Sequence, residues 1–150
     1  MEIISLRPQS FKLRTKEALV FLEPGKVTLA STKRDLPFDI TAPGEYEVLG
    51  VSVFAYKHHS SLAFLLVADG LTLVYVGDQS EKLPEELFDQ IDEVAVLFAS
   101  TSDGAVVNQA APHYLILTQP AASFTSLDRL TVQAGKLPEE RETVVLHGRN

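Results

Sequence analysis

Two almost uninterrupted apolar segments, joined by the dipeptide Asp69-Gly70, restrict the possible folds of this chain more than any other feature. The two segments read LAFLLVA and LTLVYVG. An Asp-Gly pair between two such segments is a strong signal for a β-hairpin. Strands that do not alternate polar and apolar residues are typically buried on both faces. The sequence therefore predicts a sheet that lies between two other layers of the molecule.

Short strand-like segments fill most of the remaining chain. Turns are predicted at Pro43-Gly44 and at Leu49-Gly50, and each turn is followed by a predicted strand. In the second half, VAVLFAS and HYLILTQP are predicted strands, and two more are expected on either side of a polar loop near the end. The strands predicted in the first thirty residues are 2–6, 10–15, 18–23 and 26–30.

Helical segments are few, and they alternate with strands only after Asp78. A helix is predicted over 82–93, because Pro84 suits a first turn and the two following glutamates suit the positive end of the helix dipole. TSDGAVVNQAAP predicts a cap and a short helix that ends before Pro112. TSLDRL at 125–130 is interpreted as one helical turn. This order favours two sheets packed face to face with helices outside, in a single domain of residues 1–150.

Composition and charge exclude several classes of site and partner. The chain has no cysteine, which excludes disulfides and thiolate metal ligands. The formal net charge is −7, and the single basic segment holds only Lys26, Lys33 and Arg34, so nucleic acid is not an expected partner. No apolar run approaches the length of about 18 residues that a membrane span needs, and no signal segment is recognisable. We expect a cytoplasmic protein with no membrane partner.

The segment APGEYEVLGV at 42–51 is the first of several that resemble one family. A DGL…GD hairpin follows it, and an LPEEL segment opens the next predicted helix. In these segments the chain is similar to the metallo-β-lactamase superfamily, and most closely to its small branch of predicted metal-dependent hydrolases related to ascorbate-6-phosphate lactonase. The resemblance implies an α/β, β-rich fold: an αββα sandwich of two packed mixed sheets. Because the chain is shorter than usual for the family, the flanking helices are expected to be reduced.

The resemblance also implies a metal centre at one edge of the sandwich. The family site holds one or two zinc, iron or manganese ions, which activate a water to attack an ester, lactone, amide or phosphodiester. A bound divalent ion lowers the pKa of its water to about 7. Holding such an ion takes about three or four nitrogen or oxygen ligands, with positions left open for water and substrate.

Residues 32–37 do not supply the ligands that the resemblance implies. The family's first cluster, His-x-His-x-Asp-His, corresponds to this segment. Thr32, Arg34 and Pro37 replace its three histidines, and Asp35 is the only ligand-type residue left there. None of the three replacements offers a neutral imidazole, and Arg34 carries a permanent positive charge where the metal would lie.

The later ligand positions are retained only in part. His58 or His59 matches the next histidine, Asp78 matches the bridging carboxylate, and Gln119 stands at the last histidine. Each metal position therefore keeps about two protein ligands where three or more are needed. RPQSF at 7–11 also replaces the family's GHSCF. We interpret the chain as a degenerate member of the family that has lost its metal-binding histidines, with no cofactor expected.

A carboxylate that has lost its metal needs another partner. Arg34 or Lys33 is a candidate, and we predict an ion pair between Arg34 and Asp78 or Asp35. Two adjacent histidines, such as those at 58 and 59, are more typical of a polar surface than of a metal site. His113 and His147, which match no family position, are expected to be exposed or hydrogen-bonded.

Three functions remain open. The first is a non-catalytic interaction protein that forms a homodimer, because missing helices would expose apolar sheet surface that needs cover. The second is a residual metal-dependent hydrolase that uses zinc, manganese or iron bound by Asp35, His58 or His59, and Asp78. The third is a protein that keeps the old pocket and binds a small anionic ligand without chemistry.

Overall fold

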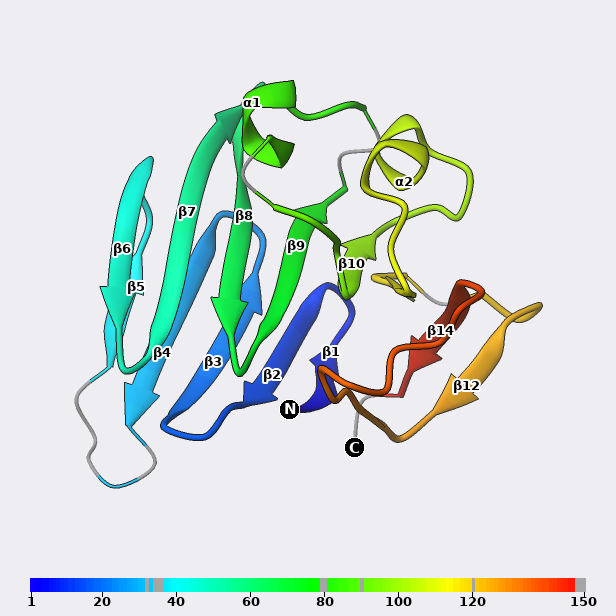
Figure 1. Ribbon diagram of the computed structural model, residues 1–150, viewed down its shortest axis with the longest axis horizontal. Coiled ribbons are helices and arrows are strands. Elements are labelled where there is room, and N and C mark those ends of the chain that lie inside the picture. The colour runs from blue at the N-terminus through cyan, green and yellow to red at the C-terminus, as the bar shows by residue number, and fades with distance from the viewer. Residues whose placement is uncertain (32, 34–36, 79–80, 90, 120, 148–150) are drawn as a thin grey trace.

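Alternating apolar residues direct one face of the first sheet into the core. The computed structural model describes residues 1–31, 33, 37–78, 81–89, 91–119 and 121–147. In β3, Ala18, Val20 and Leu22 are buried while the residues between them are partly exposed, as expected for a strand with one solvated face. The sheet is antiparallel throughout and has the order β13-β1-β2-β3-β4-β5 (Figure 1). Its strands are β1 (Glu2–Arg7), β2 (Ser10–Arg14), β3 (Ala18–Glu23), β4 (Lys26–Ser31), β5 (Phe38–Ile40) and β13 (Arg129–Thr131).

The second sheet is mixed and contains the predicted Asp-Gly hairpin. Asp69 and Gly70 both have positive φ, at 53° and 74°, which is the backbone twist that a tight two-residue hairpin needs. Strands β6 to β9 are antiparallel neighbours, whereas β9, β10, β11, β14 and β12 run parallel in that order. The strands are β6 (Gly44–Val48), β7 (Val51–His58), β8 (Ser61–Ala68), β9 (Leu71–Gly77), β10 (Val96–Ala99), β11 (Tyr114–Leu117), β12 (Thr125–Leu127) and β14 (Glu142–Leu146).

Two apolar cores lie on opposite faces of this second sheet. On one face, Phe64 and Phe98 pack against residues of the first sheet such as Phe11, whose ring centroid lies 4.9 Å from that of Phe98. On the other face, Leu65 and Val74 pack with buried residues of helices α1 (Glu85–Phe88) and α2 (Ala105–Ala110). The prediction that the hairpin strands are buried on both faces is therefore confirmed. Burial of both faces also explains why these strands lack polar alternation.

The predicted β-rich sandwich is confirmed, with two differences in detail. The first sheet is antiparallel rather than mixed, and the helices that the structure describes cover the second sheet only. The outer face of the first sheet is not the apolar surface expected from loss of helices. Ile4, Lys12, Phe21 and Thr28 are neighbours across successive strands of that face, so charged and hydroxyl groups separate the apolar ones.

The helix predicted over 82–93 is much shorter than expected. It begins at Glu85 after Pro84 and ends at Phe88, which is a single turn. A helix of this length is only marginally stable without tertiary contacts. Asp89, Asp92 and Glu93 follow it, and negative charges are unfavourable at the negative end of a helix dipole. The short helix predicted to end before Pro112 is confirmed as α2.

The helical turn predicted at 125–130 is wrong. Residues Thr125–Leu127 form β12 beside β14, and Arg129–Thr131 form β13 beside β1. The chain thus passes from one sheet to the other at Asp128. Pairing with two different sheets outweighs the weak local preference for a helical turn. Neither described helix is both long and apolar enough to cross a lipid bilayer.

Candidate functional site

Asp78 directly follows β9, at the edge of the second sheet where its parallel strands end. Gly77 precedes it with a φ of 62°, a conformation that glycine adopts without strain and that turns the chain out of the strand. Asp78 is exposed. Its Oδ1 atom accepts a hydrogen bond of 2.7 Å from Nε2 of Gln9 and a longer one of 3.4 Å from Nε2 of Gln119.

Gln9 is held in place by both of its backbone polar groups. Its φ is 69°, and its N–H donates to the carbonyl of Thr118 at 3.0 Å. Its carbonyl accepts a hydrogen bond of 2.6 Å from the hydroxyl of Tyr75. Burial, with the negative charges of Asp78 and Glu23 added, raises the pKa of Tyr75 well above its usual value, so the phenol stays protonated as a donor.

Sequence reasoning identifies Asp78 and Gln119 as neighbours at this edge but does not identify Gln9. The only sign in the sequence is that RPQSF stands at 7–11 in place of the family's GHSCF. We refer to Gln9, Asp78 and Gln119 as the amide cluster. Its residues come from the β1–β2 turn, the end of β9 and the second position after the end of β11.

The donor set of the amide cluster does not fit the metal centre that the resemblance implies. A divalent ion beside Asp78 needs ligand atoms with free electron pairs. Here the partners of Oδ1 are two amide nitrogens, which donate hydrogen atoms and do not coordinate metals. We therefore derive no chemistry through a metal at Asp78.

The predicted first cluster falls mostly outside the described residues. Thr32, Arg34 and Asp35 are not among them, so the predicted ion pair of Arg34 with either aspartate also lies outside the described part of the chain. Pro37 is exposed and immediately precedes β5. Lys33 donates its backbone N–H to Oγ of Ser31 at 3.1 Å. Within the described ranges, no ion pair joins Lys33 to Asp78.

His58 and His59 form a second polar group, which includes Glu81 rather than Asp78. His58 ends β7, and its side chain is buried, in contrast to the exposed position that is expected for such a pair. His59 is exposed in the β7–β8 turn with a φ of 56°, and its Nε2 contacts Oε2 of Glu81. Sequence reasoning does not identify Glu81, because nothing in the sequence places the segment after β9 beside this turn.

A cavity of about 540 Å³ adjoins the amide cluster. It opens between the β1–β2 turn, the end of β11 and strands β12 and β14. Thr118, which is 2% exposed, lines it, and the Oγ1 atom of Thr118 has no hydrogen-bond partner among the described residues. Ser126 and His147 also line it, with Oγ 2.5 Å from Nε2. The other lining residues are Ser5, Pro8, Phe11, Leu117, Gln119, Ala121, Ala122, Val145 and Leu146.

His113 has hydrogen-bond partners for both of its ring nitrogens. Its Nδ1 lies 2.7 Å from the carbonyl of Pro138 and its Nε2 lies 2.8 Å from Glu93. The hydrogen bond to that carbonyl, followed by the one to Glu93, raises the pKa of His113. The prediction that His113 is hydrogen-bonded is therefore confirmed, and His147 is exposed and bonded to Ser126.

Comparison with known proteins gives the fold and no more. No family model matches the chain, and no curated protein matches its sequence. A crystal structure from Thermotoga maritima, described as a proposed Zn-dependent hydrolase of the metallo-β-lactamase superfamily, is similar over 97% of this chain and 98% of its own, with a TM-score of 0.69. The two sequences are 17% identical. The chain therefore has a metallo-β-lactamase-like fold.

Proposed function

We propose that this chain is a non-catalytic protein of metallo-β-lactamase-like fold that acts as a binding module. The observation that carries this proposal is the amide cluster. Gln9 and Gln119 both direct amide hydrogens at Asp78, the residue that the family resemblance gives to the metals. A carboxylate engaged in this way has hydrogen-bond donors in place of neighbouring metal ligands.

The finer relationship, to the branch related to ascorbate-6-phosphate lactonase, is part of the proposal. It rests on the APGEYEVLGV segment at 42–51, the DGL…GD hairpin and the LPEEL segment. The same relationship supports the interpretation that an ancestral metal site was replaced. A chain of this branch that keeps Asp78 while surrounding it with glutamines has exchanged a coordination site for a hydrogen-bond site.

The cavity beside the amide cluster is the candidate ligand site. Its volume of about 540 Å³ falls in the range of about 300–1,000 Å³ that is typical of small-molecule pockets. Phe11, Leu117 and Val145 give it apolar walls, while Thr118 and His147 offer polar groups at the rim or base. We infer that it binds a small molecule with an apolar body and a polar or anionic end, the anionic end lying against His147.

The competing function is a residual hydrolase, and it is tested on protein purified without chelators. We expect no metal-dependent hydrolysis of esters, lactones or phosphodiesters above the rate of the Asp78→Asn variant. Asp78→Asn is the matched control because it keeps the shape of the side chain and removes its charge. Turnover by the wild type that a chelator abolishes, and that Asp78→Asn lacks, would overturn the proposal.

Ligand binding is tested by a thermal-shift screen with small carboxylates, sugar phosphates and nucleotides. A ligand that binds only the folded state raises the melting temperature in a concentration-dependent way. The shift should disappear in Ala122→Phe, which fills the cavity, and persist in Ser123→Phe. Residue 123 is an exposed position of the same loop that does not line the cavity. Equal shifts in both variants would remove the cavity from the proposal.

A further inference from the structure

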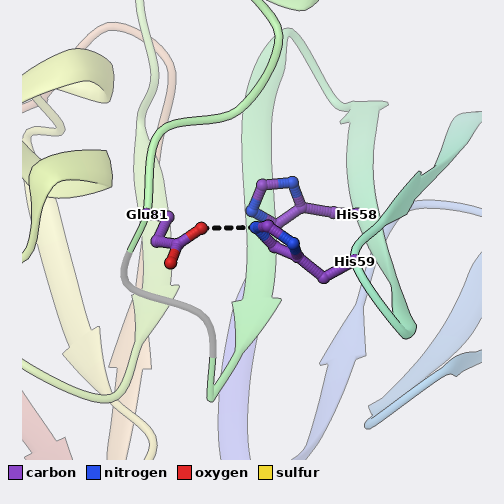
Figure 2. Close-up of side chains that lie close together, drawn as sticks. All are labelled: His58, His59 and Glu81. Atoms are coloured by element: carbon purple, nitrogen blue, oxygen red, sulfur yellow. Dashed lines mark hydrogen bonds and ion pairs between the residues drawn. The ribbon is translucent and has the colours of Figure 1, made fainter.

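Three side chains of types that can bind metals converge at the end of β7, and none of them belongs to the amide cluster. Figure 2 shows His58, His59 and Glu81 directed toward one another from the end of β7, the β7–β8 turn and the segment after β9. One ligand atom from each residue lies within 4.8 Å of the other two. We call these three residues the His–His–Glu cluster. Among the described residues, no other group of three histidines or carboxylates comes as close together.

One ring nitrogen of the buried member of the cluster has no hydrogen-bond partner among the described residues. His58 is 8% exposed, and its Nε2 atom makes no hydrogen bond to any described residue. Buried polar atoms in folded proteins are nearly always hydrogen-bonded, so an unpaired imidazole nitrogen needs an explanation. Because Nε2 belongs to a side chain that points at a second imidazole and a carboxylate, a cation is the natural partner.

The protonation of His58 is compatible with metal binding. Burial, together with the charge of neighbouring His59, lowers the pKa of His58, although Glu81 acts in the opposite direction. The neutral imidazole, whose nitrogen has a free electron pair, is the form that binds metals. Glu81 is exposed and supplies the negative charge.

We propose that His58, His59 and Glu81 bind a single divalent transition-metal ion of the zinc type. Two imidazole nitrogens and one carboxylate oxygen form a ligand set that suits zinc, whereas magnesium and calcium prefer oxygen ligands alone. Ligand atoms of a tetrahedral zinc ion lie about 3.4 Å apart, given metal–ligand distances of about 2.0–2.2 Å. The spread of up to 4.8 Å therefore requires side-chain adjustments of about an ångström.

This cluster differs from the metal centre that the family resemblance implies. It shares with that centre the histidine position matched by His58 or His59, but it uses neither Asp78 nor residues 32–37, and Glu81 matches none of the family's ligand positions. Occupancy would join the β7–β8 turn to the segment between β9 and α1, and would stabilise that end of the sheet. The inference goes beyond the proposed function, since a bound ion can fix a surface without any catalysis.

Calorimetric titration of chelator-free protein with ZnCl₂ tests the proposal. We expect one equivalent to bind, and MgCl₂ to give no heat of binding. His58→Gln and Glu81→Gln should each weaken binding by about tenfold or more. Glu85→Gln and His147→Gln are matched controls, because they change an exposed carboxylate and a histidine outside the cluster, and both should bind zinc like the wild type. Far-UV circular dichroism verifies folding, and Glu81→Gln, an exposed position, keeps the test valid if His58→Gln unfolds.

The position of the ion is tested by anomalous scattering at the zinc edge in crystals grown with ZnCl₂. A peak between His58, His59 and Glu81 is expected. Absence of binding, or equal binding by wild type and Glu81→Gln, would overturn the proposal. So would loss of binding in Asp78→Asn with full binding by Glu81→Gln, which would place the ion at the position implied by the resemblance. Hydrolase activity is measured separately, so that failure of this proposal and of the proposed function are distinguishable.

Discussion

Gln9→Ala tests whether the amide cluster is an energetic unit. The variant removes the 2.7 Å hydrogen bond to Asp78 and keeps the β-carbon, so the backbone strain at a φ of 69° is unchanged. A hydrogen bond to a charged group contributes about 1.5–3 kcal/mol when water is excluded. Because Asp78 is exposed, water competes for the carboxylate, and we expect a contribution of about 1 kcal/mol. For a chain of this size that corresponds to a decrease in melting temperature of about 2–4 °C.

A double-mutant cycle isolates this hydrogen bond from other effects of the substitution. The coupling free energy between Gln9→Ala and Asp78→Ala should be about 1 kcal/mol. For Gln119→Ala it should be much smaller, about 0.3 kcal/mol, because the bond of 3.4 Å is longer than a normal N–H···O bond. Gln133→Ala, an exposed glutamine elsewhere, is the control and should show no coupling.

Urea unfolding followed by far-UV circular dichroism measures these free energies, because the chain has no tryptophan for fluorescence. Each curve is recorded with and without a chelator. A coupling between Gln9 and Asp78 that is within error of zero would refute the reasoning. A coupling that appears only in the presence of chelator would also refute it, since Asp78 would then hold a metal in the untreated protein.

Three further predictions concern other parts of the molecule. Gln109→Leu should destabilise the chain by about 2 kcal/mol in urea unfolding, because Gln109 bonds the backbone N–H and C=O of Leu83 at 2.8 and 2.7 Å. His113→Gln should lower the melting temperature more at pH 5.5 than at pH 8, because a pKa raised by folding stabilises the native state below about 6.5, and this stabilisation is lost as the pH rises through the folded pKa. Light scattering should give twice the chain mass if the predicted homodimer forms through a surface other than the outer face of the first sheet, which lacks the expected apolar surface. A monomeric wild type would contradict the predicted homodimer.

Local patterns predicted the parts of the fold that depend on neighbouring residues. Asp69 and Gly70 adopt the turn that the Asp-Gly pair predicts, and the apolar runs on either side indicate strands that are buried on both faces. The helical turn predicted at 125–130 is wrong because the conformation of this segment depends on β14 and β1, of which β1 is distant in the sequence. A three-residue strand has almost no periodicity from which it can be recognised.

Site residues could be predicted from the sequence only where they stand at a position of a recognised motif. Asp78 and Gln119 follow from the order of motifs, and the structure brings them together. Gln9 contacts Asp78, which is 69 residues away in the sequence, and Glu81 contacts His59, which is 22 residues away. Residue spacing in the sequence does not indicate such contacts.

The passage of the chain between sheets at Asp128 sets an order on folding during synthesis. β13 can add to β1 as soon as it leaves the ribosome, because β1 was made first. β12, made just before it, borders only β14 in the described sheet and must wait for residues 142–146. Until then β11 presents an unpaired edge, and such edges invite pairing with other chains. A nascent chain that has not yet formed β14 would therefore be prone to aggregate through the free edge of β11.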